Sequence, residues 1–224
     1  EKLIEERELA GEGVKGVVTP GVKTTSQQVE AEKHLPESEH TRFRALAARA
    51  NYLAADRPDV MFAAKEICRL MAKPTDVGMA ALKRLGRYLR DSPRLVFTFP
   101  FQSAQKWEVY TDTDWAGCTR TRKSTSGGCL LLGNHVLKCW SSTQASIALS
   151  SGEAELHGIA YGAAQALGLQ SLLRDLGWHV RIRIHSDATA AIGICRRKGI
   201  GKIRHLATTD LWIQDKVRSK TIEL

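Results

Sequence analysis

The sequence lacks any apolar run long enough to span a membrane. A transmembrane helix needs about 20 consecutive apolar residues, whereas the longest candidate, Gly128–Gly133, has only the length of a strand. The chain opens with Glu-Lys-Leu-Ile-Glu-Glu, which is charged and contains no apolar core segment typical of a signal peptide. We therefore expect neither a membrane protein nor a secreted one.

Cysteine is sparse and widely spaced. The five cysteines are odd in number and form no Cys-x-x-Cys pair, which argues against a zinc site or a thioredoxin-like motif. We interpret them as buried, reduced thiols. The sequence also shows no internal repeat.

The composition is that of a folded domain, but the charge is unevenly distributed. Of the 224 residues, 43% are hydrophobic and 25% are charged, which is typical of a globular chain with a proper core. The net charge is +9. Residues 181–220 hold ten basic and three acidic residues, whereas residues 1–40 hold five basic and nine acidic residues. This excess suits a polyanion as partner, although many basic proteins bind none.

The residue pattern predicts three successive regions. Residues 1–41 are rich in glycine and polar residues, which is typical of a poorly ordered linker. Residues 42–95 carry apolar residues at helical spacing, and residues 96–224 predict a mixed α/β domain. The helices of the middle region are expected at Glu39–Ala55, after Pro58, and at Thr75–Arg90.

From residue 95 onward the pattern changes to that of strands. Gly133-Asn134 predicts a two-residue hairpin turn, and Ser150 with Glu153 forms a capping-box pattern before a long helix over about Gly152–Leu176. Strands are expected at Leu95–Phe99, Lys106–Thr111, Gly128–Leu132, His135–Trp140 and His179–His185, then helices at Thr189–Lys198 and His205–Arg218 and a short final strand.

Three carboxylates occupy related places in this pattern. Asp112 and Asp187 each close a predicted strand, and Glu155 lies in the first turns of the capped helix. Such acids can converge on one site, and their mutual repulsion favours a divalent cation. Hard oxygen ligands suit Mg²⁺ or Mn²⁺, and two such ions about 3.5–4 Å apart can clamp a phosphodiester while water attacks it.

Each acid also has a plainer interpretation. Asp112 could be a turn former, and Asp114 could be the ligand in its place. Asp187 could cap the helix that follows it, and Glu153 is better explained by capping than by metal binding. We favour the metal interpretation because the acids occur as a set in this order.

Long, ordered motifs surround these acids. The motifs around the acids are Tyr110-Thr-Asp112-Thr-Asp-Trp115-Ala-Gly117, Arg122-Lys-Ser124-Thr-Ser-Gly127-Gly128, Trp140-Ser-Ser-Thr-Gln144, Leu149-Ser-Ser-Gly-Glu-Ala-Glu155 and Ser186-Asp187-Ala188. Two further segments lie upstream of them, Tyr52-Leu-Ala-Ala-Asp56-Arg57-Pro58-Asp59-Val60 and Leu82-Lys-Arg-Leu-Gly-Arg-Tyr88-Leu89. Together the motifs around the acids closely resemble the ribonuclease H domain of Ty1/copia-type retrotransposon Pol polyproteins, and the upstream segments resemble the C-terminal end of its reverse transcriptase.

This resemblance implies a ribonuclease H-like mixed five-stranded sheet with flanking helices, preceded by a small helical segment. It implies hydrolysis of the RNA strand of RNA–DNA hybrids, with two Mg²⁺ or Mn²⁺ ions in the complete domain. Asp112, Glu155 and Asp187 match the family's first three metal-binding acids. The implied partners are the hybrid and the upstream reverse transcriptase region of the same polyprotein, and the implied location is the cytoplasm, within virus-like particles, or the nucleus.

The chain departs from the family pattern in two respects. The family has a fourth acid in a helix after the last strand, which we expect beyond Leu224, and Asp210 is not expected to replace it. The paired-Asp motif of the polymerase is absent, so no DNA synthesis is expected. Alternatives are therefore a catalytically weak or inactive remnant that binds hybrids, or a scaffold piece of a polyprotein.

Nucleic-acid contacts are expected mainly from the basic C-terminal part. Basic side chains there could neutralise phosphates, with a solvated charged face as the alternative, while Trp115 and Trp140 are expected in the core. The candidate contacts are Ser124, Arg196, Arg197, Lys198, Lys202, Arg204 and His205.

Overall fold

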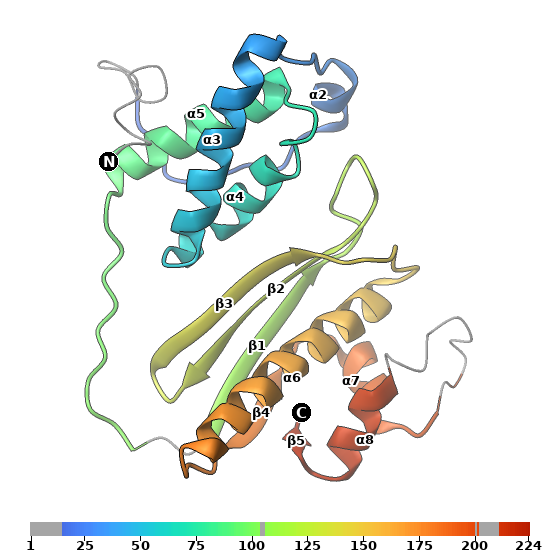
Figure 1. The fold of residues 1–224 in the computed structure, drawn as a ribbon. Coiled ribbons are helices and arrows are strands. Elements are labelled where there is room, and N and C mark those ends of the chain that lie inside the picture. Colours follow the sequence, from blue (N-terminus) through green and yellow to red (C-terminus); the bar gives the residue numbers. More distant parts are fainter. Residues whose placement is uncertain (1–14, 104–105, 200, 202–210) are drawn as a thin grey trace. The chain divides into compact units, whose positions relative to one another are not determined.

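A computed structural model describes residues 15–103, 106–199, 201 and 211–224. The chain divides into two compact units, Glu1–Phe97 and Thr98–Leu224, whose elements are labelled in Figure 1. Within the described residues, no helix has the length and apolar character needed to cross a membrane.

The first unit is helical, as predicted. The three expected helices are present, and residues 26–30 of the expected linker also form a short helix capped by Thr25 and Gln28. Its core is made of apolar side chains such as Phe43, Leu46 and Leu82. The elements are α2 (Ser26–Glu30), α3 (Glu37–Ala54), the 3-10 turn η1 (Pro58–Val60), α4 (Met61–Cys68) and α5 (Asp76–Asp91).

A buried ion pair joins η1 to the end of α5. The Arg57 guanidinium donates two hydrogen bonds to the Asp59 carboxylate, at 2.9 and 2.7 Å, and a third to the Ser92 carbonyl. The Tyr88 hydroxyl donates to the same carboxylate at 2.8 Å. These hydrogen bonds, led by that from Arg57, hold the pKa of Asp59 below its ordinary value, so its carboxylate is charged at neutral pH.

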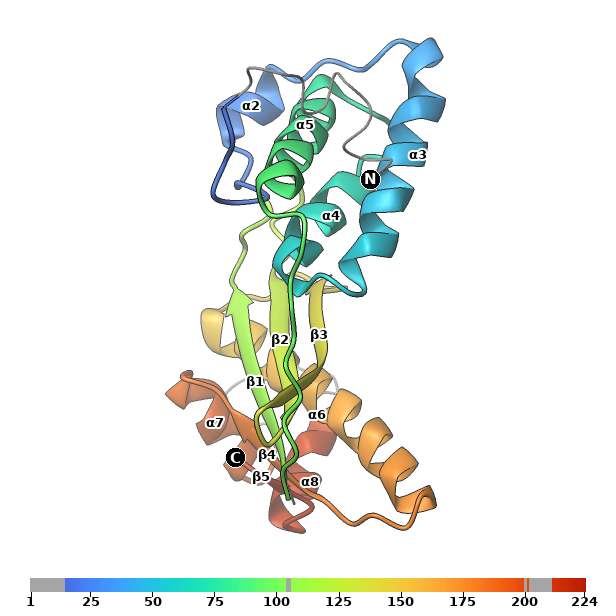
Figure 2. The same cartoon turned by 90° about the vertical axis from the view of Figure 1, so that its left-hand side faces the viewer.

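The second unit contains a five-stranded mixed sheet in the order β3-β2-β1-β4-β5. The β1–β2 and β2–β3 pairs are antiparallel, whereas β4 is parallel to both β1 and β5. This arrangement confirms the predicted ribonuclease H-like fold, which Figure 2 shows from a second side. The elements are β1 (Lys106–Asp114), β2 (Thr125–Leu132), β3 (His135–Thr143), α6 (Ser151–Asp175), β4 (Arg181–His185), α7 (Thr189–Arg196), α8 (Trp212–Arg218) and β5 (Ile222–Glu223).

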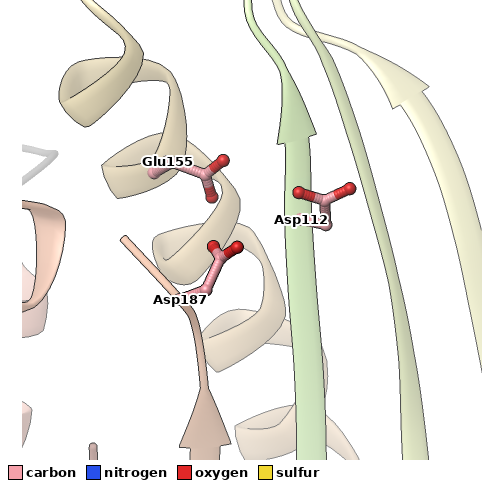
Figure 3. Close-up of side chains that lie close together, drawn as sticks. All are labelled: Asp112, Glu155 and Asp187. Atoms are coloured by element: carbon pink, nitrogen blue, oxygen red, sulfur yellow. The ribbon is translucent and has the colours of Figure 1, made fainter. Parts of the chain in front are cut away.

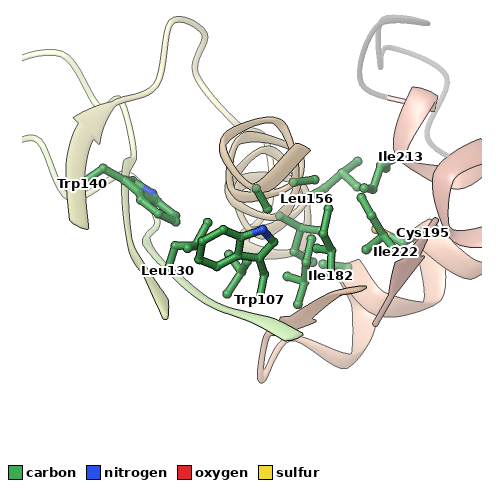
Figure 4. Packing of buried hydrophobic residues seen from close by; sticks show 14 of the residues in the cluster. Trp107, Leu130, Trp140, Leu156, Ile182, Cys195, Ile213 and Ile222 are labelled. Atoms are coloured by element: carbon green, nitrogen blue, oxygen red, sulfur yellow. The ribbon is translucent and has the colours of Figure 1, made fainter. Parts of the chain in front are cut away.

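The core of this unit lies between one face of the sheet and the helices α6, α7 and α8 (Figure 4). Alternate residues of β1 point into it, among them Trp107 and Val109. Helix α6 approaches β1 closely because two of its residues are glycines. A Cβ atom at Gly158 would lie 2.6 Å from the Thr113 hydroxyl, and one at Gly162 would lie 2.7 Å from the Thr111 methyl.

Two sequence predictions are wrong. Leu95–Phe99 forms no strand within the described residues; all five of its residues are exposed, Val96 by 80%, so this apolar segment has no buried face. Trp115 lies outside the core with 49% of its surface exposed, and its indole N–H donates to the Ala148 carbonyl at 3.0 Å. Trp140 is buried, as predicted.

Candidate metal centre

The sheet topology brings the ends of β1 and β4 together. The two strands are adjacent and parallel, with Tyr110 opposite His185. Asp112 lies two residues after Tyr110, and Asp187 lies two residues after His185. The strand pairing therefore places both acids at the same edge of the sheet, as the sequence predicts.

Helix α6 adds the third acid to this edge. Its first turn begins with the predicted cap, in which the Ser150 hydroxyl accepts from the Glu153 N–H at 3.2 Å, and Glu155 follows on the face toward β1. One carboxylate oxygen from each of Asp112, Glu155 and Asp187 lies within 4.8 Å of the other two. In Figure 3 the carboxylates of Glu155 and Asp187 point toward one another, with Asp112 beside them on β1.

Glu155 is the buried member of the cluster, with 8% of its surface exposed. Its Oε1 accepts a hydrogen bond from the Thr113 backbone N–H at 3.1 Å. Its Oε2 is buried without a hydrogen-bond partner among the described residues. An acceptor left in this state is costly, so Oε2 offers a lone pair for a cation.

The charge of Glu155 is strongly disfavoured without a cation. Burial, together with the negative charges of Asp112 and Asp187, raises the pKa of its carboxyl to about 7. A divalent ion would offset both effects, since it would give the buried carboxylate oxygen a partner and compensate the negative charge of the three acids. The donor set is made of carboxylate oxygens, which fit Mg²⁺ or Mn²⁺.

The structure distinguishes capping from metal binding for the acids in and around the cluster. Glu153 accepts from the Leu149 N–H at 2.9 Å through its Oε2, which agrees with the predicted capping role. Asp114 is not a member of the three-acid cluster found among the described residues. Helix α7 begins at Thr189, and its N-cap residue is Ala188 with no side-chain capping hydrogen bond in the described structure, so Asp187 does not occupy the capping position.

A hollow of about 740 Å³ opens beside two of the acids. Asp112 and Asp187 line it together with Tyr110 and His185, whose rings stack with centroids 4.6 Å apart. His185 Nε2 lies 2.6 Å from an oxygen of Glu108. Sequence reasoning missed these three residues, although they precede the two acids at alternating positions on paired strands.

The predicted phosphate contacts fall into two groups. Arg196 and Lys198 are exposed near the end of α7 and Arg197 is half-buried; the Arg196 guanidinium donates to the Leu224 carbonyl at 2.6 Å. Three further candidates, Lys202, Arg204 and His205, lie outside the described residues, as does Asp210.

Ser124 occupies a position that does not suit the predicted phosphate contact. Its exposed fraction is 0%, and its hydroxyl accepts from the Ala116 N–H at 3.0 Å. Ala116 has a positive φ of 51°, which is uncommon for a residue with a side chain. Burial and this hydrogen bond favour a role for Ser124 in fixing the loop after β1.

Comparison with known proteins finds relatives along most of the chain, although no family model matches it. The retrovirus-related Pol polyprotein from transposon RE2 of Arabidopsis thaliana is 29% identical over 213 residues, which are 94% of this chain and 14% of that protein. The Pol polyprotein from transposon RE1 of the same plant is 29% identical over 189 residues, 82% of this chain and 13% of that protein.

A third relative comes from another plant. The retrovirus-related Pol polyprotein from transposon TNT 1-94 of Nicotiana tabacum is 25% identical over 174 residues, which are 77% of this chain and 13% of that protein. The chain therefore spans only a small part of the length of each of these relatives.

Proposed function

Since this chain is homologous over most of its length to the retrovirus-related Pol polyproteins of copia-type transposons, we propose that it hydrolyses the RNA strand of RNA–DNA hybrids with the help of divalent metal ions. The observation that carries the proposal is the convergence of Asp112, Glu155 and Asp187, with carboxylate oxygens within 4.8 Å of one another. The ribonuclease H-like sheet and the homologues support the same function.

The three acids have different tasks in the proposed site. Glu155 is fixed by the Thr113 N–H and offers its buried Oε2 as a ligand, whereas the exposed Asp112 and Asp187 face the hollow where substrate would enter. Mg²⁺ or Mn²⁺ held by these oxygens would activate water and polarise the scissile phosphodiester. The exposed Arg196 and Lys198 are suited to neutralise backbone phosphates.

The proposed partners follow from the same homology. We propose the RNA–DNA hybrid as substrate and the upstream reverse transcriptase region of the polyprotein as neighbour. A hybrid presents two phosphate backbones, which suits the excess of basic residues in the C-terminal part of the chain.

The test is cleavage of a labelled RNA strand within an RNA–DNA hybrid, in Mg²⁺ and separately in Mn²⁺. We expect wild-type protein to cleave the hybrid but not the matching DNA duplex. Asp187→Asn should lower the rate on the order of 100-fold or more, because it removes charge that holds the ion. Asp175→Asn, at an exposed acid on the last turn of α6, should cleave at the wild-type rate.

Two outcomes would argue against the proposed hydrolysis. Cleavage that survives Asp187→Asn unchanged would place the activity elsewhere. Salt-sensitive binding of the hybrid without any cleavage by folded protein would favour the alternative of an inactive hybrid-binding protein.

A further inference from the structure

We propose that Gln144 is a positioning residue for Glu155, and that it sets the affinity of the three-acid site for its divalent ion. The inference rests on the proposed metal-dependent function, and it identifies a residue that holds one of the three acids in place. Gln144 directly follows β3 and is only 9% exposed. Its hydrogen-bond partners among the described residues are Ser124, Ser126, Ala154 and His157, and not Asp112 or Asp187.

The backbone of Gln144 anchors it to the neighbouring strand. Its N–H donates to the Ser124 carbonyl at 2.9 Å, just before β2 begins. The same Ser124 accepts from the Ala116 N–H through its hydroxyl. The residue is thereby fixed to the loop that follows β1 and Asp112.

The side chain of Gln144 reaches from this anchor to the first turns of α6. Its Nε2 donates to the Ala154 carbonyl at 2.8 Å and to the Ser126 hydroxyl at 2.9 Å. Its Oε1 lies 3.4 Å from His157 Nδ1. A carbonyl can only accept a hydrogen bond, so the NH₂ group must face Ala154 and the orientation of the amide is fixed.

The Ala154 carbonyl belongs to the peptide group whose nitrogen is that of Glu155. This carbonyl also accepts from the Thr113 hydroxyl at 3.3 Å, and the Thr113 N–H donates to the Glu155 carboxylate at 3.1 Å. Gln144 from the β3 side and Thr113 from β1 thus hold one peptide group between them. If the Gln144 bond is lost, the helix keeps its own backbone hydrogen bonds, but the Ala154 carbonyl loses its tie to the β3 side, and we expect the Glu155 carboxylate to shift relative to Asp112 and Asp187.

Glutamine has both the side-chain length and the N–H donor that this position requires. Asparagine is one methylene shorter, so it cannot span the same distance from the β3 backbone to the Ala154 carbonyl. Methionine has nearly the same volume but no N–H donor, so it would fill the space and leave the carbonyl without this donor. A residue outside the ligand set that orients a ligand typically affects metal affinity about 10–100-fold.

Gln214 provides a matched control, because it is a second buried glutamine that joins elements through its amide. It is 4% exposed, and its Nε2 donates to the carbonyls of Ile194 and Gly199 at 2.9 and 3.1 Å. Its Oε1 accepts from the Gly199 N–H at 3.0 Å. It connects α8 to α7 and to the segment after α7, whereas Gln144 connects β3 to the helix turn that carries Glu155.

The experiment compares Mn²⁺ binding by calorimetry in wild-type protein, Gln144→Met and Gln214→Met, at a pH above the pKa of Glu155 and under conditions in which all three are folded. Urea unfolding of the metal-free proteins measures the stability lost in each variant. We expect similar losses of stability in the two variants, because each removes a buried amide with comparable bonds. Only Gln144→Met should weaken Mn²⁺ binding, by about 10-fold.

Gln144→Asn serves where Gln144→Met does not fold, since it keeps a polar amide, and it should also weaken Mn²⁺ binding by about 10-fold because it cannot reach the Ala154 carbonyl. Wild-type affinity in the folded Gln144 variants would overturn the inference, as would equal weakening in Gln214→Met. If wild-type protein itself bound no Mn²⁺, the proposed metal-dependent function would be contradicted. If wild-type protein bound Mn²⁺ and the Gln144 variants bound it equally well, only the inference about Gln144 would be contradicted.

Discussion

The side chain of Glu155 is buried, with one carboxylate oxygen hydrogen-bonded and the other without a hydrogen-bond partner in the described part of the chain. Asp112 and Asp187 carry the same kind of charge but are exposed to solvent. The cost of keeping the cluster ionised therefore falls mainly on Glu155, whose pKa is raised to about 7. This residue makes the site sensitive both to protons and to cations.

The metal-free stability should depend on pH through Glu155. The folded chain retains the proton up to a pKa of about 7, whereas the unfolded chain releases it near the ordinary value of 4.5. Between these values the folded state binds more protons, so stability conferred by the protonated carboxyl is lost as pH rises. We expect the free energy of unfolding of wild-type protein, measured by urea in a chelator, to fall in this window relative to that of Glu155→Gln.

The same proton governs metal binding. Mn²⁺ requires the carboxylate, so its affinity should increase with pH up to about 7 and then level off. Parallel stability curves for wild-type protein and Glu155→Gln would contradict this account of the carboxyl.

At the level of elements, the contact between α6 and β1 sets the depth of the site. The predicted cap at Ser150 starts α6 at the right residue, but a capping pattern cannot tell how closely the helix lies against the sheet. That distance is set by Gly158, where a Cβ atom would be 2.6 Å from the Thr113 hydroxyl. Thr113 is also the residue that holds Glu155.

Gly158→Ala should therefore damage both stability and metal binding. We expect a loss of about 1–3 kcal/mol in the free energy of unfolding, the usual cost of overpacking, and weaker Mn²⁺ binding because the helix is displaced from β1. Gly168→Ala in the same helix meets nothing within 4 Å and should gain about 0.5–1 kcal/mol from helix propensity. Urea unfolding and Mn²⁺ titration of both variants check this, and a neutral Gly158→Ala would show that the close contact is dispensable.

Sequence patterns predicted the elements better than the contacts between them. Gly133-Asn134 identified the β2–β3 hairpin, and alternation in residues 181–185 identified β4. The prediction failed for Leu95–Phe99, because apolar and aromatic residues form a strand only where a neighbouring strand and a buried face exist. Gln144 was visible only as the end of a motif, since its role depends on hydrogen bonds to β2 and α6 that local sequence does not encode.

At the scale of the whole molecule, the two units have separate hydrophobic cores. The three acids, Thr113 and Gln144 all belong to Thr98–Leu224, so the candidate metal centre is built within one unit. Its parts come from β1, from the residues just after β3 and β4, and from α6, and the parallel pairing of β1 with β4 brings Asp112 and Asp187 together. The relatives that match most of the chain are retrovirus-related Pol polyproteins, and the proposed chemistry depends on a cation at this one place.

The most direct measurement is an anomalous difference map from crystals of the protein soaked in Mn²⁺. The account predicts a peak bonded to oxygens of Asp112, Glu155 and Asp187, with Oε2 of Glu155 among them, and no peak there in Asp187→Asn crystals. Peaks found only elsewhere, or none in crystals whose acids are ordered and ionised, would contradict the claim that these three carboxylates form a metal centre.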